Sequence, residues 1–117
     1  MKTVFVILHF LTDNDTIECI ESLNKNIGDE NFDIVIVDNF SNNGSLEKLM
    51  KKYNGNKRIY FIKASWNMGF AKGNNKGFDF AKKSLNADFI VLLNNDTVIE
   101  QNDFLGLVYE KYIKSSF

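Results

Sequence analysis

The chain has 117 residues, 44% hydrophobic and 25% charged, which is enough for one globular domain and too little for two. Its 14 basic and 15 acidic residues leave a formal charge of -1, which excludes the broad basic surface that nucleic-acid binding requires. The single cysteine, Cys19, excludes an intrachain disulfide and a cysteine-based metal cluster, and its helical context predicts a core position.

The N-terminal half predicts two buried strands, each followed by a helix. Val4–Leu8 is a short, continuous apolar run, as is typical of a parallel strand covered on both faces, and Phe32–Val37 repeats this pattern with one interruption at Asp33. Between them, apolar residues recur at helical intervals from Asp13, a suitable N-cap, to Gly28, which can close a helix in the left-handed conformation. A turn over residues 41–45 then leads into a second helix.

The rest of the chain continues this alternation. Arg58–Ile62 predicts a third strand, Phe70–Lys83 a third helix and Phe89–Leu93 a fourth strand. On the third helix we expect Phe70, Phe78 and Ala81 on the buried side. Strands and helices that alternate in this way predict a Rossmann-like, three-layer α/β/α domain with a mostly parallel sheet.

We expect residues 1–117 to form this single domain, with a further helix over Asp103–Tyr112 and no strand after it, so that the sheet is incomplete. Ligands of such sheets bind outside the carboxyl ends of the strands. Polar residues that directly follow the predicted strands are therefore the first candidates for a binding site.

Three strand ends carry such residues. Asp38, followed by Asn39, can accept hydrogen bonds from a base or ribose, although an aspartate that caps the following turn fits equally well. The oxygens of Asn94–Asp96 suit Mg²⁺ or Mn²⁺ if a diphosphate supplies further ligands, with a plain β-turn as the alternative. His9, the sole histidine, either faces a ligand or is a structural residue with its hydrogen bonds satisfied.

The segment Asn67–Gly77 combines glycines, amides and lysines at a predicted helix start, where a phosphate or sugar can dock. The alternative is a helix entry whose small residues pack on the sheet. The segment matches neither the dinucleotide fingerprint nor the phosphate loop. We expect Trp66 in the core, and the charged run Glu47–Lys52 on a solvated helix face.

Taken together, these segments resemble family 2 glycosyltransferases, especially the rhamnosyltransferase-like members. The resemblance spans nearly the whole chain, in order and at family-like spacing. It rests on the apolar first strand, on Val35–Asn39 with Ser41, Gly44 and Ser45, on Asn67–Ala71 with Gly73–Gly77, and on Leu92–Asp96. It implies a GT-A fold that binds a nucleoside-diphosphate sugar and transfers the sugar, with inversion, to an acceptor hydroxyl, as in polysaccharide biosynthesis.

The resemblance also implies residue roles. Asp38 would bind the base, often uracil or thymine, and Asp96 would bind the Mg²⁺ or Mn²⁺ that bridges the diphosphate, with Asn94 replacing the first acid of a D-x-D-type element. The nucleotide-sugar site implied in this way comprises His9, Phe10, Asp38, Asn39, Asn67, Gly69, Asn74, Asn75, Asn94 and Asn95, with Asp96 as the metal ligand.

Departures from the family pattern limit the expected activity. His9-Phe10-Leu11 stands where many members have Pro-Thr-Tyr, and Asn74 replaces a frequent arginine, which predicts a weaker grip on phosphate. Family members continue beyond this length into an acceptor-binding half that carries the general base. We therefore expect the chain to hold only the nucleotide-sugar-binding half, and no catalytic residue is named.

The expected partners are a UDP- or dTDP-linked sugar, a sugar or glycan acceptor and a second copy of the chain in a homodimer. No membrane span is expected, and the expected location is the cytoplasm or, within a longer parent, the cytoplasmic face of a membrane. Two other classes stay open: a nucleotidyltransferase and a non-catalytic nucleotide-binding or interaction module. The first needs a glycine-rich basic loop after the first strand, and a receiver-like module needs an acidic pair there; His9–Asp13 supplies neither.

Overall fold

A computed structural model describes residues 1–27, 31–64, 66 and 69–96 of the chain. This part alternates strands and helices in the order β1 (Thr3–His9), α1 (Asp13–Ile27), β2 (Phe32–Asp38), α2 (Ser45–Lys52), β3 (Ile59–Lys63), α3 (Gly69–Lys83) and β4 (Phe89–Asn94). The predicted alternation is confirmed, with element ends that differ by about a residue. The predicted helix over Asp103–Tyr112 and the helix closure at Gly28 lie outside the described residues.

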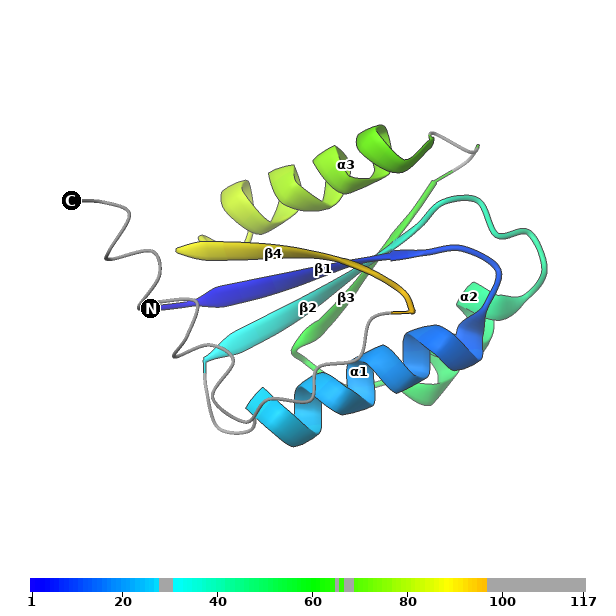
Figure 1. The fold of residues 1–117 in the computed structure, drawn as a ribbon, viewed down its shortest axis with the longest axis horizontal. Helices are drawn as coiled ribbons and strands as arrows, with labels where there is room; N and C mark the ends of the chain where they lie inside the picture. Colours follow the sequence, from blue (N-terminus) through cyan, green and yellow to red (C-terminus); the bar gives the residue numbers. More distant parts are fainter. Residues whose placement is uncertain (28–30, 65, 67–68, 97–117) are drawn as a thin grey trace.

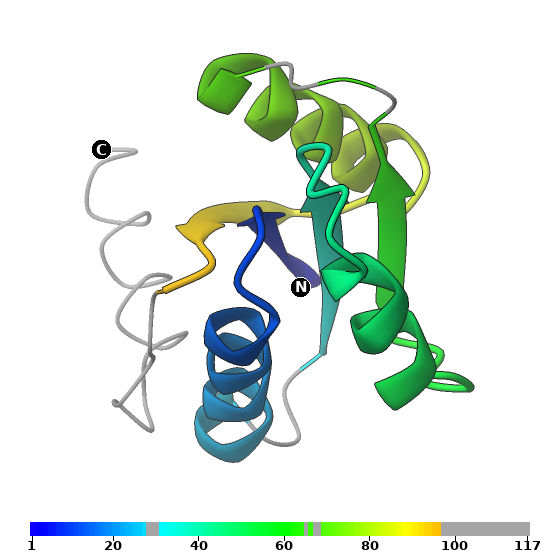
Figure 2. The same ribbon diagram turned by 90° about the vertical axis from the view of Figure 1, so that its right-hand side faces the viewer.

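The strands form one parallel sheet in the order β3-β2-β1-β4. Helices α1 and α2 cover one face of this sheet and α3 covers the other (Figures 1 and 2). The chain moves outward from β1 through β2 to β3 and then crosses back over the sheet to place β4 on the far side of β1. The strand order therefore reverses between β1 and β4, and open parallel sheets bind ligands at such a switch point.

Successive strand residues point to opposite faces of the sheet, so continuous apolar runs serve two cores at once. The core under α1 and α2 contains Phe5, Ile7, Cys19, Ile20, Leu23, Ile34, Ile36 and Leu49. The core under α3 contains Val4, Val6, Leu8, Val35, Val37, Ala81 and Leu85. Cys19 is fully buried in the first of these cores, as predicted.

Helix α3 packs on the sheet through small residues. Ala81 is fully buried as predicted, but Phe78 is 40% exposed, so the prediction that it lies on the buried side was wrong. A β-carbon added to Gly77 would overlap Val6 Cγ1 and lie 2.8 Å from Val37 Cγ2, and one added to Gly73 would lie 2.6 Å from Leu8 Cδ1. The helix and the sheet are therefore too close for side chains at these two positions.

Trp66 and the lysines of α2 lie at the surface. Trp66 is 54% exposed, with the Lys72 ammonium 5.5 Å from its ring centroid, so the prediction that it lies in the core was wrong. The lysines of α2 are exposed, as expected for a solvated helix face. Within the described ranges, no helix has both the length and the apolar character needed to cross a bilayer.

Candidate functional site

Residues from separate parts of the sequence meet at the carboxyl ends of β1 and β4. A cavity of about 360 Å³, here called the Asp96 pocket, is lined by Leu8, Phe10, Asn39, Asn94, Asn95 and Asp96. It lies at the carboxyl ends of β1 and β4, where the strand order reverses. The structure thus brings together Phe10, Asn39 and the whole Asn94–Asp96 segment, which the sequence analysis singled out independently.

The Asp96 pocket contains oxygen ligands of the kind that hard cations prefer. The side-chain amide of Asn95 donates a hydrogen bond to Thr12 Oγ1 at 2.8 Å, which fixes the segment that carries Asn94 and Asp96. Among the described residues, no group of three His, Cys, Asp or Glu side chains comes together. As described, this pocket therefore offers one carboxylate with neighbouring amides, a set that fits a divalent cation when phosphate oxygens of a ligand complete its coordination.

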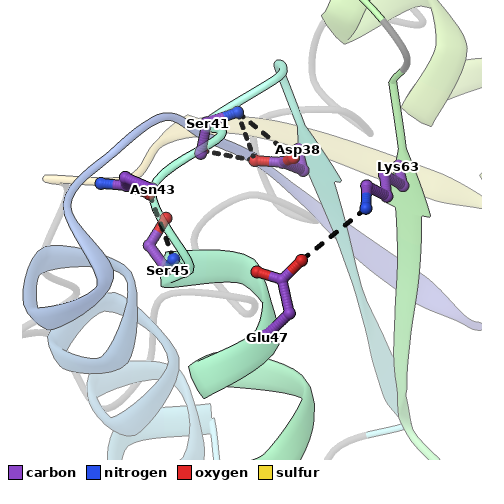
Figure 3. A network of polar contacts seen from close by, with 6 residues as sticks. All are labelled: Asp38, Ser41, Asn43, Ser45, Glu47 and Lys63. Carbon is purple, nitrogen blue, oxygen red and sulfur yellow. Dashed lines mark hydrogen bonds and ion pairs between the residues drawn. The ribbon is translucent and has the colours of Figure 1, made fainter.

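A second cavity, of about 220 Å³, lies at the ends of β2 and β3 and is here called the Asp38 pocket. Its lining residues are Asp38, Phe40, Asn42, Gly44, Leu46, Glu47 and Lys63. The Asp38 carboxylate accepts hydrogen bonds from the backbone N–H of Ser41, at 3.3 Å, and from the Ser41 hydroxyl (Figure 3). Asp38 therefore both caps the turn after β2 and faces a cavity, which joins the two interpretations that the sequence left open.

Lys63 and Glu47 belong to this pocket although the sequence analysis did not single them out as site residues. The Lys63 ammonium lies 3.7 Å from a Glu47 carboxylate oxygen, and the two side chains are 66% and 63% exposed (Figure 3). Ion pairs as exposed as this one contribute little to stability. Lys63 directly follows the predicted strand Arg58–Ile62, just as Asp38 follows Phe32–Val37, so the strand-end rule that selected Asp38 could also have selected Lys63.

His9 lies behind both pockets and is fully buried. Its Nδ1 lies 2.6 Å from the Thr16 hydroxyl on α1, and its Nε2 lies 2.8 Å from the Ser45 hydroxyl on α2. Burial lowers the pKa of His9, and this effect outweighs the carboxylates of Asp38 and Asp13, which raise it. A neutral imidazole with both nitrogens occupied joins the end of β1 to two helices, so His9 positions the site, and its ring is not available to a ligand.

The loops after β1 and β2 are bonded to one another. The Leu11 N–H donates to the Ser41 hydroxyl at 3.0 Å, and the Asn43 side-chain amide donates to the Leu11 carbonyl at 2.8 Å. Leu11 and Phe40 have positive φ angles of 62° and 60°. Bulky side chains adopt this conformation at a cost of roughly 1–2 kcal/mol, and such strain tends to occur at functional sites. The hydrogen bonds hold these strained loops at the edge of both pockets.

Three of the predicted site residues lie in the first part of α3. Gly69 begins the helix with a φ of 77°, Asn75 is exposed, and Asn74 is 7% exposed with a buried Oδ1 that has no hydrogen-bond partner in the described part of the chain. None of these three residues lines either cavity as the described residues define it. Asn67 lies outside the described residues.

The sequence model of the family described as "Glycosyl transferase family 2" matches residues 5–115. The chain belongs to this family. The match covers both loops and the Asn94–Asp96 segment, so the resemblance inferred from the motifs is confirmed. A search of curated proteins gave no match.

Solved structures agree on the fold of this family 2 chain. TarS from S. aureus in complex with UDP-GlcNAc is 20% identical, with a TM-score of 0.72 over 94% of this chain and 30% of that one. The mannosyltransferase PcManGT from Pyrobaculum calidifontis, in complex with GDP-Man and Mn²⁺, is 14% identical, with a TM-score of 0.72 over 88% of this chain and 30% of that one. These likenesses confirm the predicted α/β fold class, and the chain spans less than a third of either neighbour.

Proposed function

We propose that this chain is the donor-binding part of a glycosyltransferase, which holds a nucleoside-diphosphate sugar along the carboxyl edge of its sheet for transfer to an acceptor hydroxyl. The observation that carries the proposal is the Asp96 pocket, where Phe10, Asn39 and Asn94–Asp96 converge at the strand switch point. Family membership supports it, as do two neighbours solved with UDP-GlcNAc and with GDP-Man and Mn²⁺.

We assign the diphosphate to the Asp96 pocket. Asp96 and Asn94 would hold Mg²⁺ or Mn²⁺ there, and a bound cation would neutralise charge on the departing nucleoside diphosphate. Because the protein supplies a single carboxylate, phosphate oxygens must complete the coordination, so metal and nucleotide should bind together. Gly69, Asn74, Asn75 and Asn67, which belong to the start of α3 or precede it, are proposed to approach the diphosphate or the ribose.

We assign the base, uracil or thymine in a UDP- or dTDP-linked donor, to the Asp38 pocket. Asp38 retains lone pairs beyond those that accept from Ser41, so it can take a further hydrogen bond from a ring N–H. Phe10, which is 41% exposed, and Asn39 line the Asp96 pocket and are proposed to contact the nucleotide. His9 acts indirectly, by holding these loops through Thr16 and Ser45.

The proposal covers the leaving-group side of the reaction. In an inverting transfer, an acceptor hydroxyl attacks the anomeric carbon while a base removes its proton, and no described residue is assigned as that base. We propose that the chain alone binds its donor weakly and transfers little or no sugar.

Calorimetric titration of the chain with UDP and dTDP, with and without Mn²⁺, tests this function. We expect binding that requires Mn²⁺ and that is lost in Asp96→Ala and weakened in Asp38→Ala. Asp79→Ala, which removes an exposed carboxylate of α3, is the matched control and should bind normally. Absence of metal-linked binding at millimolar nucleotide would refute the assignment and favour a non-catalytic interaction module.

A further inference from the structure

The Asp38 pocket places a hydrogen-bond acceptor and a donor on neighbouring strands. Asp38 of β2 and Lys63 of β3 are register partners at the ends of their strands. Every second side chain of a strand points to the same face of the sheet. Ile36 and Phe61, two positions before Asp38 and Lys63, belong to the core under α1 and α2. The two side chains therefore leave the same face of the sheet, about 5 Å apart, which is the spacing of adjacent strands.

The two groups are not paired with each other. The Asp38 carboxylate binds Ser41, whereas the Lys63 ammonium extends toward Glu47 on α2 (Figure 3). Both residues line the same cavity. A carboxylate is an acceptor only and an ammonium is a donor only, so the hydrogen-bond pattern that this edge of the cavity offers has a fixed polarity.

This polarity distinguishes the nucleobases. Uracil, thymine and guanine each present a ring N–H beside a carbonyl oxygen, which complements a carboxylate beside an ammonium. With the diphosphate held in the Asp96 pocket and the base in the same orientation, cytosine and adenine present a ring nitrogen lone pair to the Asp38 carboxylate and an amino group to the Lys63 ammonium. A site built to hydrogen-bond one pattern rejects the other because its polar groups are left unpaired.

We infer that Lys63 is a specificity-determining residue, which acts with Asp38 to select donors whose base carries an N–H next to a carbonyl oxygen. This inference rests on the proposed function, because it requires a nucleotide with its base in the Asp38 pocket. Glu47 keeps the Lys63 ammonium over the cavity through an exposed and long ion pair, so the ammonium can turn to the base at little cost.

Binding of UDP, GDP, CDP and ADP to the chain, each with Mn²⁺, tests the inference, because the four ligands share a diphosphate and differ in the base. We expect UDP and GDP to bind at least about 10-fold more tightly than CDP and ADP, as one mismatched hydrogen bond to a charged group implies. Lys63→Met should weaken the binding of UDP by about 10-fold and leave the binding of CDP unchanged, so that the preference for UDP is lost.

Two control variants separate base recognition from general charge. Lys48→Met removes an exposed ammonium of α2 that does not line the pocket, and it should keep the preference for UDP. Lys51→Met removes a second exposed ammonium of α2 outside the pocket and should also keep the preference. Circular dichroism of each variant checks that the fold is retained.

The outcomes distinguish the two proposals. If all four nucleotides bind equally in an Asp96-dependent manner, or if Lys63→Met weakens all of them alike, base selection is wrong and donor binding stands. Loss of the preference in Lys48→Met or Lys51→Met would reassign the discrimination to general charge and overturn the role of Lys63. A chain that binds none of the four at millimolar concentration overturns both proposals.

Discussion

The Nε2 atom of His9 lies 2.8 Å from the hydroxyl of Ser45, although 36 residues separate the two in the sequence. This contact ties the end of β1 to the start of α2, and the Nδ1 contact with Thr16 ties the same ring to α1. One buried side chain thereby joins the end of β1 to the two helices that follow the loops bordering the candidate site.

Replacing His9 with leucine should therefore destabilise the protein. The substitution leaves the Thr16 and Ser45 hydroxyls buried without their partner, and we expect the free energy of unfolding in urea to fall by about 2–4 kcal/mol. The triple variant His9→Leu, Thr16→Val, Ser45→Ala removes all three polar groups together and should recover part of that loss. A single variant as stable as the native chain would show that the network contributes nothing.

The same histidine predicts a pH dependence of stability. Burial lowers its pKa below 6.5 in the folded chain, so between the folded and unfolded pKa values the unfolded state binds the additional proton. Stability from this source is complete above about pH 6.5 and is lost as the pH falls through the folded pKa. Urea unfolding at several pH values should show that the free energy of unfolding falls less with acidification in His9→Gln than in the native chain. The carboxylates are the same in both proteins, so the difference between the two slopes reports His9. Equal slopes would contradict the prediction.

Gly77 should tolerate no side chain. In an exposed helix, glycine to alanine stabilises by about 1 kcal/mol, but at this position a β-carbon overlaps Val6 Cγ1. Overpacking of this kind costs typically 1–3 kcal/mol, so we expect Gly77→Ala to lower the free energy of unfolding. Lys76→Ala, at the exposed neighbouring position, should change it by less than about 0.5 kcal/mol. A Gly77→Ala protein more stable than the native chain would mean that α3 sits farther from the sheet.

Cys19 should be chemically inert in the folded protein. Burial, with a smaller contribution from the Asp96 carboxylate, raises the pKa of its thiol to about 12, so almost no thiolate exists at pH 8. Iodoacetamide should label Cys19 slowly in native buffer and rapidly in urea, as followed by intact mass spectrometry. Rapid labelling of the native chain would place the thiol at the surface.

The sequence allowed the fold to be predicted because strands buried on both faces are nearly continuous apolar runs, as Val4–Leu8 is and as Phe32–Val37 is apart from Asp33. The packing of α3 could not be predicted in the same way. Hydrophobic periodicity favoured Phe78, whereas the helix approaches the sheet at Gly73 and Gly77, where the absence of a side chain is the determining property. Close backbone approach leaves no hydrophobic signal in the sequence.

The site was predictable where position along a strand decides it. Asp38 and Asn94–Asp96 follow apolar runs, and parallel strands bring such ends to one edge of the sheet. The role of His9 was not predictable, because its partner Ser45 comes from a distant part of the sequence. Lys63 stands in the same position after its predicted strand as Asp38 does, so the strand-end rule could have found it.

The interior position of β1 has a consequence for synthesis on the ribosome. Thr3 pairs with Phe32 on one side and with Phe89 on the other, so the first strand to be made waits longest for its second neighbour. Until β4 emerges, a nascent chain carries β1 with an open hydrogen-bonding edge, which is a template for association with other chains. The cavity beside Asp96 forms in the same late event, so the proposed nucleotide would stabilise only a chain in which β4 has paired with β1.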